Sequence, residues 1–443
     1  MDVPAGGVSA RNRSRFFVLA LVLSTALMAL LAWLSTGTMA IYAVSLVTPW
    51  EMEGYIVNYD HHGYTWNWKF VTGDHAGLAV WNSVGNRLLL FVLSIPLGKL
   101  LGFFAGVIVT GIVINLVVYV VFVLFVRRTY GEVAGFVAMA MLSTYPGIFY
   151  WIGMPYAHSL IIPSILVAAM LAHKMLETRS VALLALEAFG VGLTFTAYDL
   201  AATVLPSVML TLLLRRRFAA AAIAFLPMAL PAIALPFAVH LAGYSVGAPE
   251  TYLAVVRAYL HPGPPGPWWE LVKSVPVTFV LNYFDGNYWV MPSCFLVLFA
   301  WGRIRLKVRL STFELAVALA LLAVFLFNNL APPYAGGNMT MRGPLFARLY
   351  QPVFIVMVLY SARLLAFTWS QRLKCRTWMT ICVAVCFALN LAIGLGPILR
   401  NQTALLAYQH FYRGTSDTSI YDNLGKYGRS PLGIPMRRAG AVR

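Results

Sequence analysis

The chain has 443 residues, 60% of them hydrophobic and only 11% charged, with a formal net charge of +17. Soluble domains carry about 25% charged residues, so a soluble fold of this size could not bury so much apolar surface. The basic residues lie in short clusters between apolar runs, without a nucleic-acid motif, which argues against nucleic acid as a partner. Because apolar runs of about 20 residues recur along the chain, the sequence predicts an all-α polytopic membrane protein.

Eleven apolar segments are predicted to cross the membrane. They cover residues 16–46, 104–126, 131–150, 158–173, 181–197, 200–214, 218–244, 288–302, 312–328, 352–370 and 377–396. The first segment follows three arginines and is longer than the apolar core of a usual signal peptide. We therefore expect an uncleaved first helix that enters from the cytoplasm, rather than a removed signal peptide.

A cytoplasmic N-terminus agrees with the distribution of charge. Short inner segments then carry 18 of the 32 basic residues: Arg11, Arg13, Arg15, Arg127, Arg128, Lys174, Arg179, Arg215, Arg216, Arg217, Arg303, Arg305, Lys307, Arg309, Arg363, Arg372, Lys374 and Arg376. This is the excess that the positive-inside rule requires. Four cysteines without disulfide or zinc spacing, and no retention signal, favour a multi-pass protein of a bacterial plasma (inner) membrane.

Polar outer regions divide the chain. The first outer loop covers 48–103, the second 245–287 and the third 328–351. We expect an N-terminal transmembrane module at 1–244 that includes the first loop, and a C-terminal transmembrane region at 245–396. Residues 397–443 are expected to form an outer tail.

Two segments in these loops are expected to lie in the outer interface instead of spanning. Residues 87–103 are apolar, but Pro96 and Lys99 interrupt the run, and a spanning helix here would place the following basic pair outside. Residues 268–283 begin with two tryptophans, a residue that favours the depth of the lipid headgroups.

The first outer loop concentrates residues that could bind a sugar. Carboxylates, histidines and aromatic residues crowd it: Glu53, Tyr59, Asp60, His61, His62, Tyr64 and Asp74. Aromatic rings stack on sugar rings, and a carboxylate can accept the proton of an attacking hydroxyl. The alternative is a solvated loop with an interfacial aromatic belt. The adjacent histidines could bind phosphate, tune Asp60 or ligate a metal, although neighbouring side chains point to different sides of a regular element.

A further acid, Asp199, lies at the predicted outer turn between two apolar segments. A carboxylate so close to the membrane is a candidate for the site. It could equally cap the helix that begins near Leu200.

The order of these elements resembles the GT-C superfamily of membrane glycosyltransferases, and glycosyltransferase family 39 in particular. The resemblance rests first on an acidic first outer loop with Tyr59-Asp60-x-x-x-Tyr64, followed by an interfacial helix from Asn86-Arg87-Leu88-Leu89. Next come the basic pair in Arg127-Arg128-Thr129-Tyr130-Gly131 and an apolar helix ending in Pro146. The last element is a stretch from Arg342 to Pro352 before a late span. It covers about residues 16–220 and, more loosely, 275–370. The chain lacks the adjacent Asp-Glu pair of many members, and His61-His62 stands where Gly-Gln occurs, so the choice among Asp60, Glu53 and Asp74 stays open.

The resemblance implies inverting transfer of a sugar on the outer leaflet. The donor would be a polyprenyl-phosphate sugar and the acceptor a lipid, glycan or protein, in contact with membrane lipids. Asp60, ahead of Glu53 and Asp74, would be the general base. Arg342 and Arg348, followed by Lys99 and Arg87, would stabilise the leaving phosphate, and the remaining residues of the expected site are Tyr59, His61, His62, Tyr64, Asp199 and Tyr350. No cofactor is assigned, and a divalent cation stays open.

Three other functions compete with this one. A transporter or flippase of lipid-linked glycans would need charged or broken helices near the midplane, where Glu187 is the clearest charge, and the chain has no internal repeat. An O-antigen ligase or polymerase depends on a large late loop, which is short here. A non-catalytic assembly subunit would differ only in activity.

Overall fold

The computed structural model describes residues 10–38, 67–73, 87–146, 148, 152, 157–198, 204–241, 289–330 and 353–399. Regular structure in these residues is helical throughout. The helices are α1 (Ala10–Thr38), α4 (Leu89–Leu101), α5 (Phe103–Tyr130), α6 (Glu132–Ser143), η1 (Ala157–Leu160), α8 (Ile161–Met175), α9 (Val181–Leu193), η2 (Thr194–Thr196), α10 (Val204–Leu214), α11 (Phe218–Leu241), α14 (Val290–Ile304), α15 (Thr312–Leu330), α17 (Val353–Ser370) and α18 (Arg376–Leu399). The predicted all-α class is therefore confirmed for this part of the chain.

Each of the eleven apolar segments coincides with one of these helices. Four of the helices that the structure describes contain a stretch long and apolar enough to cross a membrane: Ser14–Leu34, Ala105–Tyr130, Val353–Ser370 and Arg376–Leu395. One of the helices is shorter than predicted: α6 ends at Ser143 instead of continuing to residue 150. Pro146 explains the early end, because proline lacks the amide hydrogen of a helix and disfavours helical backbone in the residue before it.

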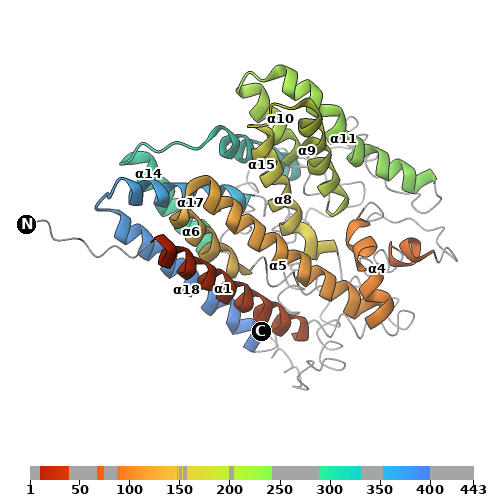
Figure 1. Cartoon of the computed structure of the whole chain (residues 1–443), viewed down its shortest axis with the longest axis horizontal. Helices are drawn as coiled ribbons and strands as arrows, with labels where there is room; N and C mark the ends of the chain where they lie inside the picture. The colour runs from red at the N-terminus through yellow and green to blue at the C-terminus, as the bar shows by residue number, and fades with distance from the viewer. Residues whose placement is uncertain are drawn as a thin grey trace, which may run out of the picture.

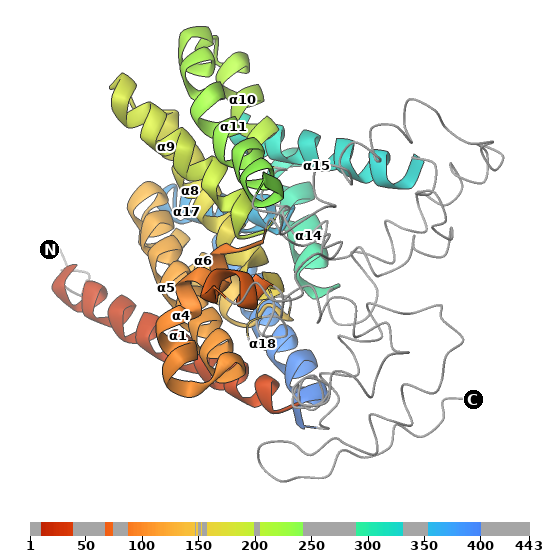
Figure 2. The ribbon, with the colours of Figure 1, turned by 90° about the vertical axis from the view of Figure 1, so that its right-hand side faces the viewer.

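The helices form a bundle in which α6 packs against α1, α5, α17 and α18. Figures 1 and 2 both show α9, α10 and α11 grouped together, away from α1 and α18. Large apolar side chains on the outside of the bundle remain exposed, for example Leu23 on α1 at 60% and Leu226 on α11 at 68%. Exposed apolar surface on this scale is typical of helices that face lipid.

Contacts bring the predicted inner segments together at one end of the bundle, here called the basic end. Arg127 lies over the Phe17 ring, with its guanidinium carbon 4.2 Å from the ring centroid. His173 packs edge-on against Phe125, with ring centroids 5.3 Å apart. Arg217 donates hydrogen bonds to the carbonyls of Met175 (3.0 Å), Leu176 (2.6 Å) and Thr178 (2.7 Å). Met175 is the last residue of α8, and the other two lie in the turn that follows.

Glu187 also contacts this end of the bundle. Its carboxylate is buried and accepts a hydrogen bond of 2.8 Å from the Thr178 hydroxyl, in the turn between α8 and α9. This partner explains why a carboxylate is tolerated in an apolar helix. The side chain of Glu187 therefore reaches toward the basic end, and its depth in the membrane stays a prediction.

Helix α4 forms a hairpin with α5. Gly102 links the two helices with a φ of 87°, a left-handed conformation that favours glycine. The backbones of Gly98 and Gly106 meet so closely that a side chain on Gly106 would collide with Gly98. Thirteen residues make α4 about 20 Å long. Its orientation in the outer interface stays a prediction.

We expect Gly106→Ala to destabilise the protein by about 1–3 kcal/mol, because the added methyl group forces the α4 and α5 backbones apart. Ala105→Val is the matched control, since Ala105 is the exposed neighbour on the same turn. Thermal unfolding of both variants in detergent would test this. An unchanged midpoint for Gly106→Ala would contradict the close approach of the two helices.

Candidate functional site

Most residues of the expected site lie outside the described residues. These are Glu53, Tyr59, Asp60, His61, His62, Tyr64, Asp74, Asp199, Arg342, Arg348 and Tyr350. The structure places the remaining two, Arg87 and Lys99, at opposite ends of α4.

Arg87 lies two residues before the start of α4 and is half-buried. Its guanidinium carbon lies 4.2 Å from the ring centroid of Tyr198, at the far end of the α9–η2 segment. Tyr198 is 1% exposed, so this cation–π contact is largely shielded from water. Such a contact contributes up to about 2 kcal/mol when desolvated, and it fixes the arginine against a rigid surface.

Asn67 joins this pair from a third part of the chain. It is fully buried, and its side-chain amide donates a hydrogen bond of 3.4 Å to the backbone carbonyl of Arg87. The next residue, Trp68, packs with its ring against Gly98 of α4. Asn67, Arg87 and Tyr198 all make further interactions besides these. We call these three residues the Arg87 cluster.

The Arg87 cluster joins the segments that the sequence singled out. Asn67 follows Tyr64 by three residues, and Tyr198 directly precedes Asp199. The cluster therefore joins Asn67, which follows the tyrosine- and histidine-rich stretch in the sequence, to the start of α4 and to Tyr198, which precedes Asp199 in the sequence. A guanidinium held on an aromatic face in apolar surroundings is suited to bind phosphate oxygens in pairs.

Lys99 does not belong to this cluster. It is exposed in the last turn of α4, twelve residues beyond Arg87. At 1.5 Å per residue the two positions lie about 18 Å apart along the helix. Arg87 and Lys99 are therefore alternatives to each other as phosphate ligands, and of the two we favour Arg87.

The sequence did not single out three buried polar residues, Asn67, Tyr198 and Asn115. Asn115 is buried within α5 and donates hydrogen bonds to the carbonyls of Gly111 (2.8 Å) and Ser159 (2.7 Å), which fixes η1 against α5. A lone amide in a long apolar run was a usable signal for it. The burial of Asn67 and Tyr198 had no comparable signal, because neither lies in an apolar run with a clear period.

The described residues contain no group of three or more His, Cys, Asp or Glu side chains placed to hold a metal ion. His61 and His62 lie outside them. A divalent cation at these histidines therefore stays a prediction.

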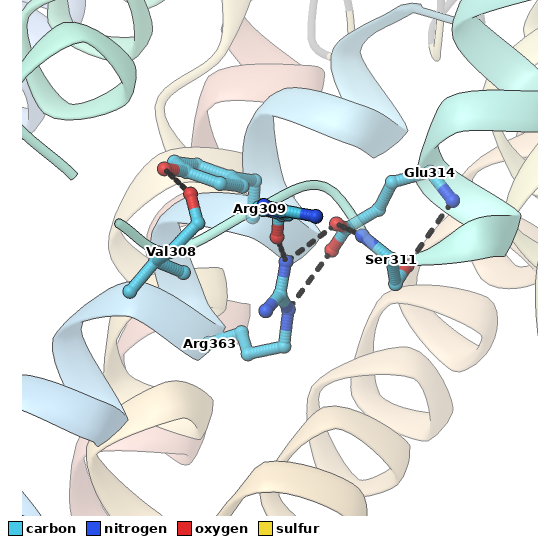
Figure 3. A network of polar contacts seen from close by, with 6 residues as sticks. Val308, Arg309, Ser311, Glu314 and Arg363 are labelled. Atoms are coloured by element: carbon cyan, nitrogen blue, oxygen red, sulfur yellow. Dashed lines mark hydrogen bonds and ion pairs between the residues drawn. The ribbon is translucent and has the colours of Figure 1, made fainter. Parts of the chain in front are cut away.

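A second polar cluster lies at the basic end and is shown in Figure 3. Ser311 and Glu314 form a capping box at the start of α15: the Ser311 amide donates to the Glu314 carboxylate (2.6 Å), and the Glu314 amide donates to the Ser311 hydroxyl (3.2 Å). Arg363 of α17 holds the same carboxylate with two bonds of 2.7 and 3.3 Å, and donates to the Arg309 carbonyl (2.8 Å). These hydrogen bonds of Arg363 are all made within the cluster, so we interpret the cluster as a structural link between α15 and α17.

Comparison with known proteins assigns no family. No family model matches the chain, and neither a curated protein nor a solved structure matches it. The functional interpretation therefore rests on the Arg87 cluster and on the sequence pattern around it.

Proposed function

We propose that this chain is an inverting membrane glycosyltransferase of the GT-C type. It transfers a sugar from a polyprenyl-phosphate donor to a lipid, glycan or protein acceptor on the outer leaflet. All eleven helices that match the apolar segments cross the membrane, and the basic end faces the cytoplasm. The Arg87 cluster supports the proposal, because it brings a half-buried cation together with Asn67 and Tyr198, which in the sequence adjoin the segments that hold the candidate acids.

The proposed reaction is a single displacement. The acceptor oxygen attacks the anomeric carbon while Asp60 accepts its proton, and the bond from that carbon to the phosphate oxygen breaks. The leaving group is the polyprenyl phosphate, which carries the displaced electron pair as negative charge. Arg87, together with Arg342 and Arg348, stabilises this charge by hydrogen bonds that strengthen as it develops.

The proposed orientation predicts that reporter fusions at Arg216, Lys307 and Lys374 all report the cytoplasm. These residues lie in three separate turns of the basic end. The positive-inside rule assigns such turns to the cytoplasm. An outside signal at two of the three positions would overturn the orientation.

The activity can be tested by incubating the purified protein with a panel of polyprenyl-phosphate sugars and measuring the release of lipid phosphate. We expect Arg87→Ala to raise the KM for the donor about 10–100-fold, because a hydrogen bond to a charged group contributes about 1.5–3 kcal/mol. Arg87→Lys should recover only part of this loss, since lysine cannot bind in a bidentate manner. Arg179→Ala is the control, because Arg179 is an exposed arginine of the basic end.

Two outcomes would count against the proposal. Donor turnover that is insensitive to Arg87→Ala would remove the cluster from the site. No turnover with any donor, together with energy-independent movement of a lipid-linked glycan across vesicles, would favour a flippase.

A further inference from the structure

A second feature lies on the outside of the bundle, remote from the Arg87 cluster. The first half of α6, the end of α17 and the start of α18 enclose an apolar groove of about 400 Å³. The lining includes Val133 and Ala140 of α6, Trp369 of α17, and Thr380 and Ala384 of α18. The volume lies within the range of small-molecule sites, about 300–1,000 Å³. From Val133 to Ala140 the groove follows α6 for about 10 Å, starting at the basic end.

Basic residues lie on and beside the helices that line this groove. The guanidinium carbon of Arg376 lies 4.8 Å from the ring centroid of Trp369, which itself lines the groove. The indole of Trp369 donates a hydrogen bond of 3.0 Å to the Thr380 hydroxyl, so the ring that carries the arginine is held in place. Arg372 and Lys374 are both exposed in the turn between α17 and α18.

The acid nearest in sequence to the lining residues does not cancel this charge. Glu132, which begins α6, is paired with Arg127 at 3.5 Å. The mouth of the groove therefore presents a positive surface next to an apolar slot. Basic pockets between membrane helices on the cytoplasmic side are suited to anionic lipid headgroups.

We propose that this groove is a binding site for an anionic phospholipid of the inner leaflet. One acyl chain occupies the slot between α6, α17 and α18, and the phosphate binds Arg376, with Arg372 and Lys374 beside it. The positive charge of these basic residues complements the negative headgroup, which is why we assign the groove to an anionic phospholipid. A second protein chain would need to bury more than about 1,000 Å² for a stable interface, which is far more than the nine lining residues offer.

The proposal is tested by titrating the purified protein with phosphatidylglycerol or phosphatidylcholine of identical acyl chains, and counting bound lipids by native mass spectrometry. We expect the first phosphatidylglycerol to bind at least about fivefold more tightly than phosphatidylcholine, since each nearby basic residue contributes about that factor. Arg376→Gln should reduce this preference about fivefold. Ala384→Phe fills the slot and should weaken both lipids. Arg215→Gln, an exposed arginine of the α10–α11 turn, should behave as wild type.

Several results would overturn the proposal. One is equal affinity of the wild-type protein for the two lipids, which needs no variant and so does not depend on folding of a mutant. Others are unchanged lipid binding in Ala384→Phe, or equal behaviour of Arg376→Gln and Arg215→Gln. A dimer that Ala384→Phe dissociates would assign the groove to a second copy instead. The assay measures no sugar transfer, so it is independent of the proposed activity.

Discussion

Replacing Arg363 with methionine is expected to lower the free energy of unfolding by about 3–5 kcal/mol, because the change leaves a buried carboxylate without its counter-ion. The Glu314 side chain is 1% exposed, whereas Arg363 is 25% exposed. Their contact is bidentate, with the shorter bond at 2.7 Å. The Ser311 amide would still donate to Glu314, but one neutral donor cannot replace a guanidinium.

The matched controls separate this effect from loss of packing. Arg363→Met with Glu314→Gln removes both charges and should recover much of the stability, because no buried ion is left unpaired. Glu132→Gln breaks the pair of Arg127 and Glu132, whose side chains are 27% and 30% exposed, and should cost less than about 1 kcal/mol. Unfolding in mixed micelles by increasing anionic detergent gives all three values. Equal losses for Arg363→Met and Glu132→Gln would contradict the structural role of the buried pair.

The helices could be predicted from the sequence because their signal is local. A long apolar run needs its backbone hydrogen bonds satisfied within the segment, and a helix does this wherever the run occurs. The ends were less predictable: α6 ends at Ser143, although its apolar segment was expected to continue to residue 150. Hydropathy measures the preference of a segment for lipid, and it does not report where the backbone leaves the helix.

The pairings between helices could not be predicted because they depend on residues far apart in the chain. Arg363 was counted as one of many basic residues of an inner segment, yet its partner Glu314 lies 49 residues earlier. Likewise, Arg87 was ranked behind Arg342 and Arg348 as a phosphate ligand, since nothing in its neighbourhood indicated that Tyr198 would lie beneath it. Composition marked these residues as candidates, and only the packing of the helices distinguishes structural roles from functional ones.

Replacing Asp60 with asparagine is expected to reduce the rate of sugar transfer about 10²–10⁴-fold, the usual effect of removing a general base. Asparagine keeps the size and much of the hydrogen bonding of aspartate but cannot accept the proton of the acceptor hydroxyl. Because the charge on Asp60 has no part in holding the donor phosphate, kcat should fall while the KM for the donor changes little. Arg87→Ala should instead raise the KM for the donor and also lower kcat, because its hydrogen bonds hold the phosphate before the reaction and strengthen as charge develops. The rise in KM therefore distinguishes a ligand of the leaving group from a base.

Glu53→Gln and Asp74→Asn are the controls, because they alter the other acids of the same loop by the same chemistry. Each variant is compared with wild type by the release of lipid phosphate at saturating donor, after its thermal midpoint in detergent has been matched to wild type. If Asp60→Asn keeps wild-type turnover while one of the other two abolishes it, the loop holds the base but Asp60 is not that residue. If all three variants keep full activity, the first outer loop does not supply the base, and Asp199 beside the Arg87 cluster becomes the next acid to replace.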